Sequence, residues 1–100
     1  MSKVVFIGDS ITKGVRTGVT ETDTFVYKVA TTKGFSSYLN KGVPNDTADG
    51  GLARFSSDVL AHNPDLCVIM FGTNDVFYNK PIATYYNSIL SMVQQCKAII

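Results

Sequence analysis

Two uninterrupted apolar runs constrain the fold of this chain more than any other feature. The first covers Lys3 to Ile7 and stops at Gly8, and the second covers Leu66 to Phe71 and stops at Gly72. A strand with one solvated face alternates apolar with polar residues, and neither run does so. Strands without that alternation are buried on both faces, which is typical of a parallel sheet with helices on each side.

The segments between and after these runs have the apolar spacing of helices. One helix is expected over about 48–59, capped by Asp46 or Thr47, another from Pro81 onward, and a shorter one over Phe25 to Thr32. A short strand is expected at Ser36 to Leu39. The apolar faces of the two longer helices are predicted to be Ala48, Leu52, Phe55 and Val59, and Ile82, Tyr86, Ile89 and Val93. The resulting β-α-β-α-β-α order predicts an α/β fold.

Composition excludes several classes of protein. The chain has 100 residues and a net charge of +1, and no basic block suggests a nucleic-acid surface. No apolar run approaches the roughly 18–20 residues of a membrane helix. The N-terminus lacks the features of a secretory signal, so we expect a cytoplasmic protein. Its two cysteines, Cys67 and Cys96, are expected to be reduced and inert in the core.

The C-terminal residues look like the start of a further strand. Ala98, Ile99 and Ile100 follow the last expected helix and are all apolar. We therefore expect residues 1–100 to form a single domain that is incomplete at its C-terminus. The alternative is that Ile99 and Ile100 extend the last helix and pack on the sheet.

Three polar clusters follow the expected strands. They are Gly8-Asp9-Ser10, Asn40 to Thr47, and Gly72-Thr73-Asn74-Asp75. Ligands of parallel α/β sheets bind outside the carboxyl ends of the strands, so we expect these clusters to meet. The spacings of a P-loop, a dinucleotide-binding loop and a Gly-x-Ser-x-Gly elbow are all absent.

These clusters resemble the sequence blocks of the SGNH, or GDSL, hydrolases. Residues 5–12 resemble the first block, residues 40–47 with the following 51–55 resemble the second, and residues 71–75 resemble the third. The blocks come in the family's order and cover nearly the whole chain. The resemblance implies a three-layer α/β/α sandwich with a parallel, flavodoxin-like sheet. It also implies a serine esterase that acts on a small ester without a cofactor, with acetyl or short acyl esters, or lipid or thioester acyl groups, as candidate substrates.

The family's catalytic residues can be carried over to matching positions. The resemblance makes Ser10 the nucleophile, which would form an acyl-enzyme. It makes the backbone N–H of Ser10, the backbone N–H of Asn45 and the side chain of Asn74 the donors of the oxyanion hole. Supporting roles are expected for Gly8, Asp9, Gly42, Asp46, Gly72 and Asp75.

The second block departs from the family pattern at one position. Asn45 stands where the family usually has a glycine, whose backbone N–H is the donor. Asparagine is the residue after glycine that best tolerates a positive φ, so Asn45 is expected to replace it. Its side chain would narrow the acyl pocket.

A second departure concerns the catalytic base. The family carries Asp-x-x-His near its C-terminus, and nothing in this chain matches that block. His62 falls at the end of an expected helix, at the opposite end of the sheet, where a solvated role is expected. Association with a C-terminal part or a second chain is therefore expected. The alternative is a non-catalytic binding or structural domain that lacks the base.

Two smaller alternatives concern acidic and aromatic residues. Asp9, Asp46 and Asp75 at strand ends could form a magnesium site of a phosphotransfer domain, although the neighbouring Ser and Asn fit that reading less well. Tyrosines follow the third block, and one of them could border the substrate cleft. These tyrosines are Tyr78, Tyr85 and Tyr86.

Overall fold

The computed structural model describes residues 2–98. The strands are β1 (Lys3–Gly8), β2 (Ser37–Gly42) and β3 (Leu66–Met70). The helices are α1 (Ser10–Lys13), α2 (Phe25–Thr32), α3 (Ala48–Ala53), α4 (Phe55–Asp58), α5 (Thr73–Phe77) and α6 (Ile82–Ala98). Two short 3-10 turns, η1 (Glu21–Asp23) and η2 (Leu60–His62), complete the described secondary structure.

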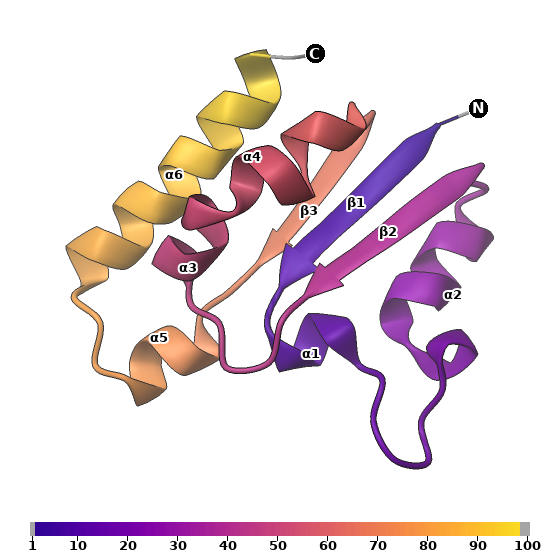
Figure 1. The fold of residues 1–100 in the computed structure, drawn as a ribbon, viewed down its shortest axis with the longest axis horizontal. Coiled ribbons are helices and arrows are strands. Elements are labelled where there is room, and N and C mark those ends of the chain that lie inside the picture. The colour runs from indigo at the N-terminus through magenta and orange to yellow at the C-terminus, as the bar shows by residue number, and fades with distance from the viewer. Residues whose placement is uncertain (1, 99–100) are drawn as a thin grey trace.

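The three strands form one parallel sheet in the order β2-β1-β3. The central strand β1 is buried from Val4 to Gly8, as its unbroken apolar run predicts. In the register of the sheet, Gly8 lies opposite Gly42 on one side and Met70 on the other. The carboxyl ends of all three strands therefore meet at one edge, where α1, α5 and the loop from β2 to α3 are gathered (Figure 1).

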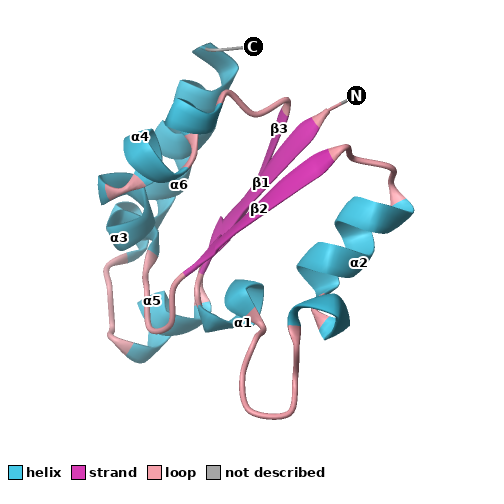
Figure 2. Cartoon of the chain, turned by 45° about the vertical axis from the view of Figure 1, so that its right-hand side comes forward, coloured by secondary structure: helices cyan, strands magenta, loops and turns pink. Residues whose placement is uncertain are grey.

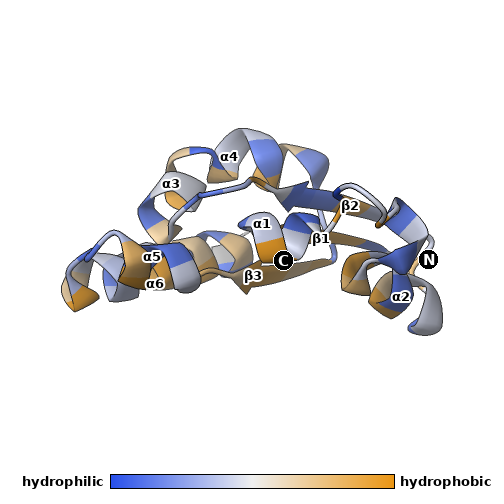
Figure 3. Ribbon diagram, turned by 90° about the horizontal axis from the view of Figure 1, so that it is seen from below, coloured by the Kyte–Doolittle hydropathy of each residue, from blue (hydrophilic) through white to orange (hydrophobic). Residues whose placement is uncertain are grey.

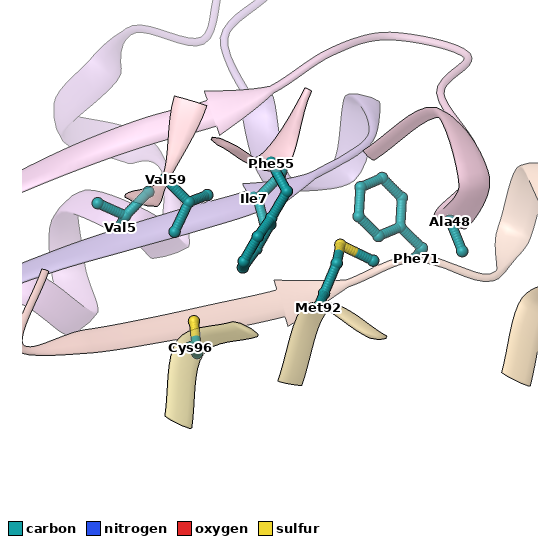
Figure 4. Packing of buried hydrophobic residues seen from close by; sticks show 8 residues of the cluster. All are labelled: Val5, Ile7, Ala48, Phe55, Val59, Phe71, Met92 and Cys96. Atoms are coloured by element: carbon teal, nitrogen blue, oxygen red, sulfur yellow. The ribbon is translucent and has the colours of Figure 1, made fainter. Parts of the chain in front are cut away.

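Helices cover both faces of the sheet, which confirms the α/β/α prediction. Helices α3, α4 and α6 lie on one side and α2 lies on the other (Figure 2). On the first side, alternate residues of β1, Val5 and Ile7, pack with Phe55, Met92 and their neighbours (Figure 4). On the second side, Val4 and Phe6 of the same strand pack with α2. The hydrophobic core thus continues through the sheet, and most of it lies under α3, α4 and α6.

Two predicted boundaries differ from the structure. The second strand is longer than expected and runs to Gly42, because it stays paired with β1 as far as Gly8. The helix expected over 48–59 ends at Ala53, and α4 follows after Arg54, which has the non-helical angles φ −108° and ψ 7°. Phe55 and Val59 are nevertheless fully buried, as their spacing predicts.

The prediction for the last helix was wrong for part of its face and for its end, although Ile89 packs against the core as expected. Ile82 is 86% exposed and Tyr86 is 62% exposed, whereas Met92 and Cys96 are buried. The buried side of α6 also includes the polar Ser88, which interrupts the apolar pattern on that face. Ala98 belongs to the helix and not to a strand. The expectation for Ile99 and Ile100 lies outside the described residues.

One side of β3 is left open in the part of the chain that is described. Leu66 is 45% exposed and Met70 is 38% exposed, and within residues 2–98 the strand pairs only with β1. Hydrophobic residues line β3 and parts of α5 and α6 (Figure 3). No helix within residues 2–98 has the length and apolar character needed to cross a membrane.

Candidate active site

The first loop presents Ser10 at the start of α1. Asp9 caps this helix, and its buried carboxylate accepts a hydrogen bond from the backbone N–H of Ile11 at 2.9 Å. Ser10 is the first residue of the helix and is exposed. The hydroxyl group of Ser10 is therefore carried by a capped turn at the end of the central strand.

Two glycines allow α1 to lie directly against the strand ends. A Cβ atom on Gly8 would lie 2.1 Å from Thr12 Oγ1 and 2.6 Å from the carbonyl oxygen of Met70. A Cβ atom on Gly42 would lie 2.2 Å from the backbone nitrogen of Lys13. Both contacts are too short for any side chain, so glycine is required at each position by packing.

The second loop contains a tight turn built by Pro44 and Asn45. The backbone N–H of Asp46 donates to the carbonyl oxygen of Val43 at 3.2 Å, and Asn45 has φ 67°. Proline at the second position and a positive-φ residue at the third are typical of a type II turn. The backbone N–H of Asn45 has no protein acceptor among the described residues, and neither does that of Ser10.

The third loop is bonded to the second by two adjacent side chains. The side-chain amide of Asn74 donates to the backbone carbonyl of Asp46 at 3.0 Å. The buried carboxylate of Asp75 accepts the backbone N–H of Ala48 at 3.0 and 3.3 Å. Gly72, which begins this loop, has φ 148° and leads β3 into α5. Because one amide hydrogen of Asn74 goes to Asp46, the second remains for a ligand.

Sequence reasoning missed Asn40 and Arg54. The Asn40 amide nitrogen donates to the carbonyl oxygens of Thr12 and Lys13, and its oxygen accepts the backbone N–H of Gly42. The Arg54 guanidinium binds the Asp46 carboxylate at 2.7 Å and also reaches the ends of β1 and β2. Both residues lie in the segments that resemble the second block, 40–47 and 51–55, and this position was the available signal for them.

Asp49 makes a further connection between the second and third loops. Its carboxylate accepts the Thr47 hydroxyl and pairs with the Lys80 ammonium at 3.1 Å. The hydrogen bond from Thr47 and the bond and charge of Lys80 lower the pKa of Asp49. These contacts join the start of α3 to the segment between α5 and α6.

The acidic residues do not come together as a metal site. The Asp9 carboxylate is bonded to Ile11, the Asp46 carboxylate to Thr47 and Arg54, and the Asp75 carboxylate to Ala48. Among residues 2–98, no group of three or more His, Cys, Asp or Glu residues could hold a metal ion. This arrangement gives no support to the magnesium alternative.

Comparison with known proteins identifies the family. The GDSL-like Lipase/Acylhydrolase family matches residues 6–100. The chain belongs to this family. This match confirms the resemblance drawn from the three sequence blocks, and the family's description supports an ester hydrolase at the level of the family.

Relatives of known structure extend this result. The chain is 31% identical to an acetylxylan esterase of Geobacillus stearothermophilus, over 98% of the chain and 55% of that protein. A G-D-S-L family protein of Desulfitobacterium hafniense DCB-2 is 34% identical, with a TM-score of 0.88, over 98% of this chain and 54% of that one. TesA is 28% identical, with a TM-score of 0.83, over 97% of this chain and 55% of that one. The chain thus spans about half the length of these GDSL-like relatives.

The histidine of this GDSL-like chain lies far from Ser10. His62 ends η2, and its backbone carbonyl accepts the Lys3 ammonium at 3.0 Å. Lys3 begins β1, whereas Ser10 follows the other end of the strand, about 17 Å away at 3.3 Å per residue. The residue three positions before His62 is Val59, so an Asp-x-x-His block is absent.

A small pocket borders the third loop of the GDSL-like site. Its volume is about 140 Å³, and its lining residues are Gly72, Asp75, Val76, Lys80, Ile82 and Tyr85. The Tyr85 hydroxyl donates to the carbonyl oxygen of Phe71 at 2.9 Å, at the end of β3. Of the three tyrosines considered from the sequence, Tyr85 lines this pocket, whereas Tyr78 and Tyr86 are exposed.

Proposed function

We propose that this chain supplies the nucleophile and the oxyanion hole of a serine esterase that hydrolyses carboxylic esters. The Ser10 hydroxyl attacks the ester carbonyl, its proton passes through a base to the leaving alcohol, and an acyl-enzyme remains. Water then attacks the acyl group, which releases the acid and restores Ser10. The observation that carries this proposal is the hydrogen bond from Asn74 to Asp46, because it holds the third loop against the turn of Asn45.

The oxyanion hole in this proposal has three donors from three loops. They are the backbone N–H of Ser10, the backbone N–H of Asn45 and the remaining amide hydrogen of Asn74. The two backbone groups have no protein acceptor among the described residues, which supports their use by a ligand. Fixed donors of this kind stabilise the negative oxygen of the tetrahedral intermediate.

The general base in this proposal is a histidine outside residues 1–100. His62 lies at the wrong end of β1, and no second histidine is present. Two solved structures of the Geobacillus stearothermophilus acetylxylan esterase are of catalytic mutants, one of an aspartate and one of a histidine three positions later. This spacing supports an Asp-x-x-His segment as the source of the base.

We propose that the segment with the base also covers the open side of β3. Leu66 and Met70 are exposed there, and the edge of β3 is unpaired within the described residues. The relatives are nearly twice as long as this chain, which leaves enough length for further strands and helices. An unpaired edge strand readily pairs with another strand.

Acetyl esters are the first substrates to test. Acetylxylan esterases are among the relatives of this chain, and the pocket beside the third loop is small. We propose an acetyl or other short acyl ester of a small alcohol or a carbohydrate.

The test compares ester hydrolysis by the natural protein that carries residues 1–100 with hydrolysis by residues 1–100 alone. We expect the natural protein to hydrolyse p-nitrophenyl acetate, and Ser10→Ala to abolish this activity. Residues 1–100 alone should be slower by roughly 10²–10⁴-fold, because the base is absent. Added imidazole should restore a part of the rate that Ser10→Ala again removes. If Ser10→Ala left the rate unchanged in every form of the protein, the result would instead support the non-catalytic alternative.

A further inference from the structure

Arg54 joins the loops of the candidate site through a single guanidinium group. Its Nε atom donates to Asp46 Oδ2 at 2.7 Å, and Nη2 donates to the carbonyl oxygen of Gly8 at 3.0 Å. Its Nη1 atom donates to the carbonyl oxygen of Lys41 at 2.9 Å and to Asp58 Oδ2 at 2.8 Å. The side chain is only 19% exposed. One cation therefore contacts the ends of β1 and β2, the turn of the second loop and α4.

We propose that Arg54 is a positioning residue of the oxyanion hole. It holds the segment before Ser10 and the turn of Asn45 in one fixed relation, so that donors from separate loops point at one oxygen atom. This inference rests on the proposed esterase function, and it gives a positioning role to a residue of the segment 51–55, to which the family resemblance assigned none.

Arg54 positions Ser10 and Asn45 through the carbonyl oxygen of Gly8. It accepts Nη2 of Arg54 and also the backbone N–H of Val43, each at 3.0 Å. Gly8 lies two residues before Ser10, and Val43 lies two residues before Asn45. The backbone N–H groups of Ser10 and Asn45, two of the three proposed donors, therefore each lie two residues after a residue that is bonded at this carbonyl.

Arg54 positions Asn74 through Asp46. Its carboxylate is held by Arg54 and by the backbone N–H of Thr47, and its backbone carbonyl accepts the Asn74 amide. Fixing the Asp46 side chain thus restrains the peptide that orients Asn74. Arg54 reaches the third donor through this one residue.

Lysine cannot make the same set of contacts. The planar guanidinium has five N–H donors that point in fixed directions, and Arg54 uses them on two carboxylates and two carbonyls. A lysine ammonium is a compact charge on a flexible stem. Arg54→Lys keeps the positive charge beside Asp46, but it leaves the carbonyl oxygens of Gly8 and Lys41 without this donor.

The kinetic test uses the natural protein and a matched control. Arg54→Lys should lower kcat for p-nitrophenyl acetate by about 10- to 100-fold with little change in KM, because small misplacement of catalytic groups costs this much. Asp58→Asn removes only the outer ion pair of the same guanidinium, away from the three loops, and should leave kcat nearly unchanged. An unchanged kcat in Arg54→Lys would overturn the proposal.

A double-mutant cycle separates positioning from general destabilisation. If Arg54 acts through the oxyanion hole, Arg54→Lys should lower kcat by a much smaller factor in the Asn74→Ala variant than in the unmodified protein. If the factors by which the two single variants lower kcat simply multiply in the double variant, and Arg54→Lys also lowers Tm, the role of Arg54 is purely structural and the proposal is overturned.

A spectroscopic test does not depend on esterase activity. In amide NMR spectra of the same protein, Arg54→Lys should shift the backbone signals of Ser10 and Asn45 and the side-chain signal of Asn74, whereas Asp58→Asn should not. Unchanged signals would overturn the positioning role. If Ser10→Ala has no effect on hydrolysis while these signals still move, the esterase function fails and the positioning of the loops by Arg54 stands.

Discussion

The side-chain amide of Asn74 donates a hydrogen bond to the backbone carbonyl of Asp46 at 3.0 Å. Asp46 directly follows Asn45, so this bond places a donor side chain of the third loop beside the turn of the second. A neutral amide has two N–H groups, and the bond to Asp46 fixes the orientation of the other. The predictions on Asn74 and Asn45 follow from this arrangement.

Asn74→Ala should lower kcat for p-nitrophenyl acetate by roughly 10²–10³-fold in the natural protein, with a much smaller change in KM. The reason is that the lost bond strengthens mainly in the transition state. Steady-state kinetics with Asp49→Asn as a control for the nearby loop contacts would check this. A large rise in KM with unchanged kcat would place Asn74 in ground-state binding instead.

The variants Asn45→Gly and Asn45→Val should differ sharply in kcat. Glycine adopts φ 67° without strain and keeps the backbone N–H, so kcat should change little. A β-branched valine at this φ costs roughly 1–2 kcal/mol or displaces the turn, and kcat should fall. Kinetics of the two variants side by side would check this prediction. If Asn45→Gly were the more damaging change, the asparagine side chain itself would carry the function.

Hydrogen exchange at the open side of β3 should differ between residues 1–100 alone and the natural protein. In residues 1–100 alone, the β3 amides that do not pair with β1 should exchange rapidly with deuterated water. In the natural protein they should be protected, because the proposed C-terminal segment pairs with this edge. Hydrogen exchange of β1, which is paired on both sides in each form, is the internal control. Equal protection of β3 in both forms would contradict the proposed pairing.

The Cys67 thiol should be unreactive in the folded chain. Burial and the neighbouring Cys96 thiol raise the pKa of Cys67 to about 12. The thiol therefore stays protonated in the folded state, so its contribution to stability is present below the ordinary pKa of 9.0 and is lost as the pH rises toward 12. Alkylation by iodoacetamide at pH 8, measured by mass with Cys67→Ser as control, should be slow until denaturant is added. Rapid alkylation of Cys67 in the folded chain would contradict this.

Several features of the fold and site could be predicted from the sequence, for physical reasons that are now visible. The unbroken apolar run of β1 required burial on both faces, and that condition alone specified a covered parallel sheet. Parallel strands carry their following loops to one edge, so Asp9, Asp46 and Asp75 were correctly expected there. Asn45 adopts the positive φ that its place in the second block predicted.

Other features depend on tertiary contacts that no local pattern records. The break at Arg54 occurs where its guanidinium binds strand ends that are distant in the sequence. The buried face of α6 includes Ser88 as well as Ile89, and its exposed face carries Ile82 and Tyr86, so hydrophobic spacing predicted the buried face only in part. The polar residues at the end of β2 continue the strand because β1 pairs with them, although they have little strand propensity of their own.

The central claim is that Ser10 is the nucleophile, and trapping the serine with a fluorophosphonate tests it most directly. The natural protein should gain the mass of one phosphonyl group, with fluoride as the leaving group, and peptide mapping should place the group on Ser10. Ser10→Ala should gain none, and Asn74→Ala should react more slowly because the phosphonyl oxygen uses the same donors. A phosphonyl group on another residue, or equal labelling of the protein with and without Ser10, would contradict the account.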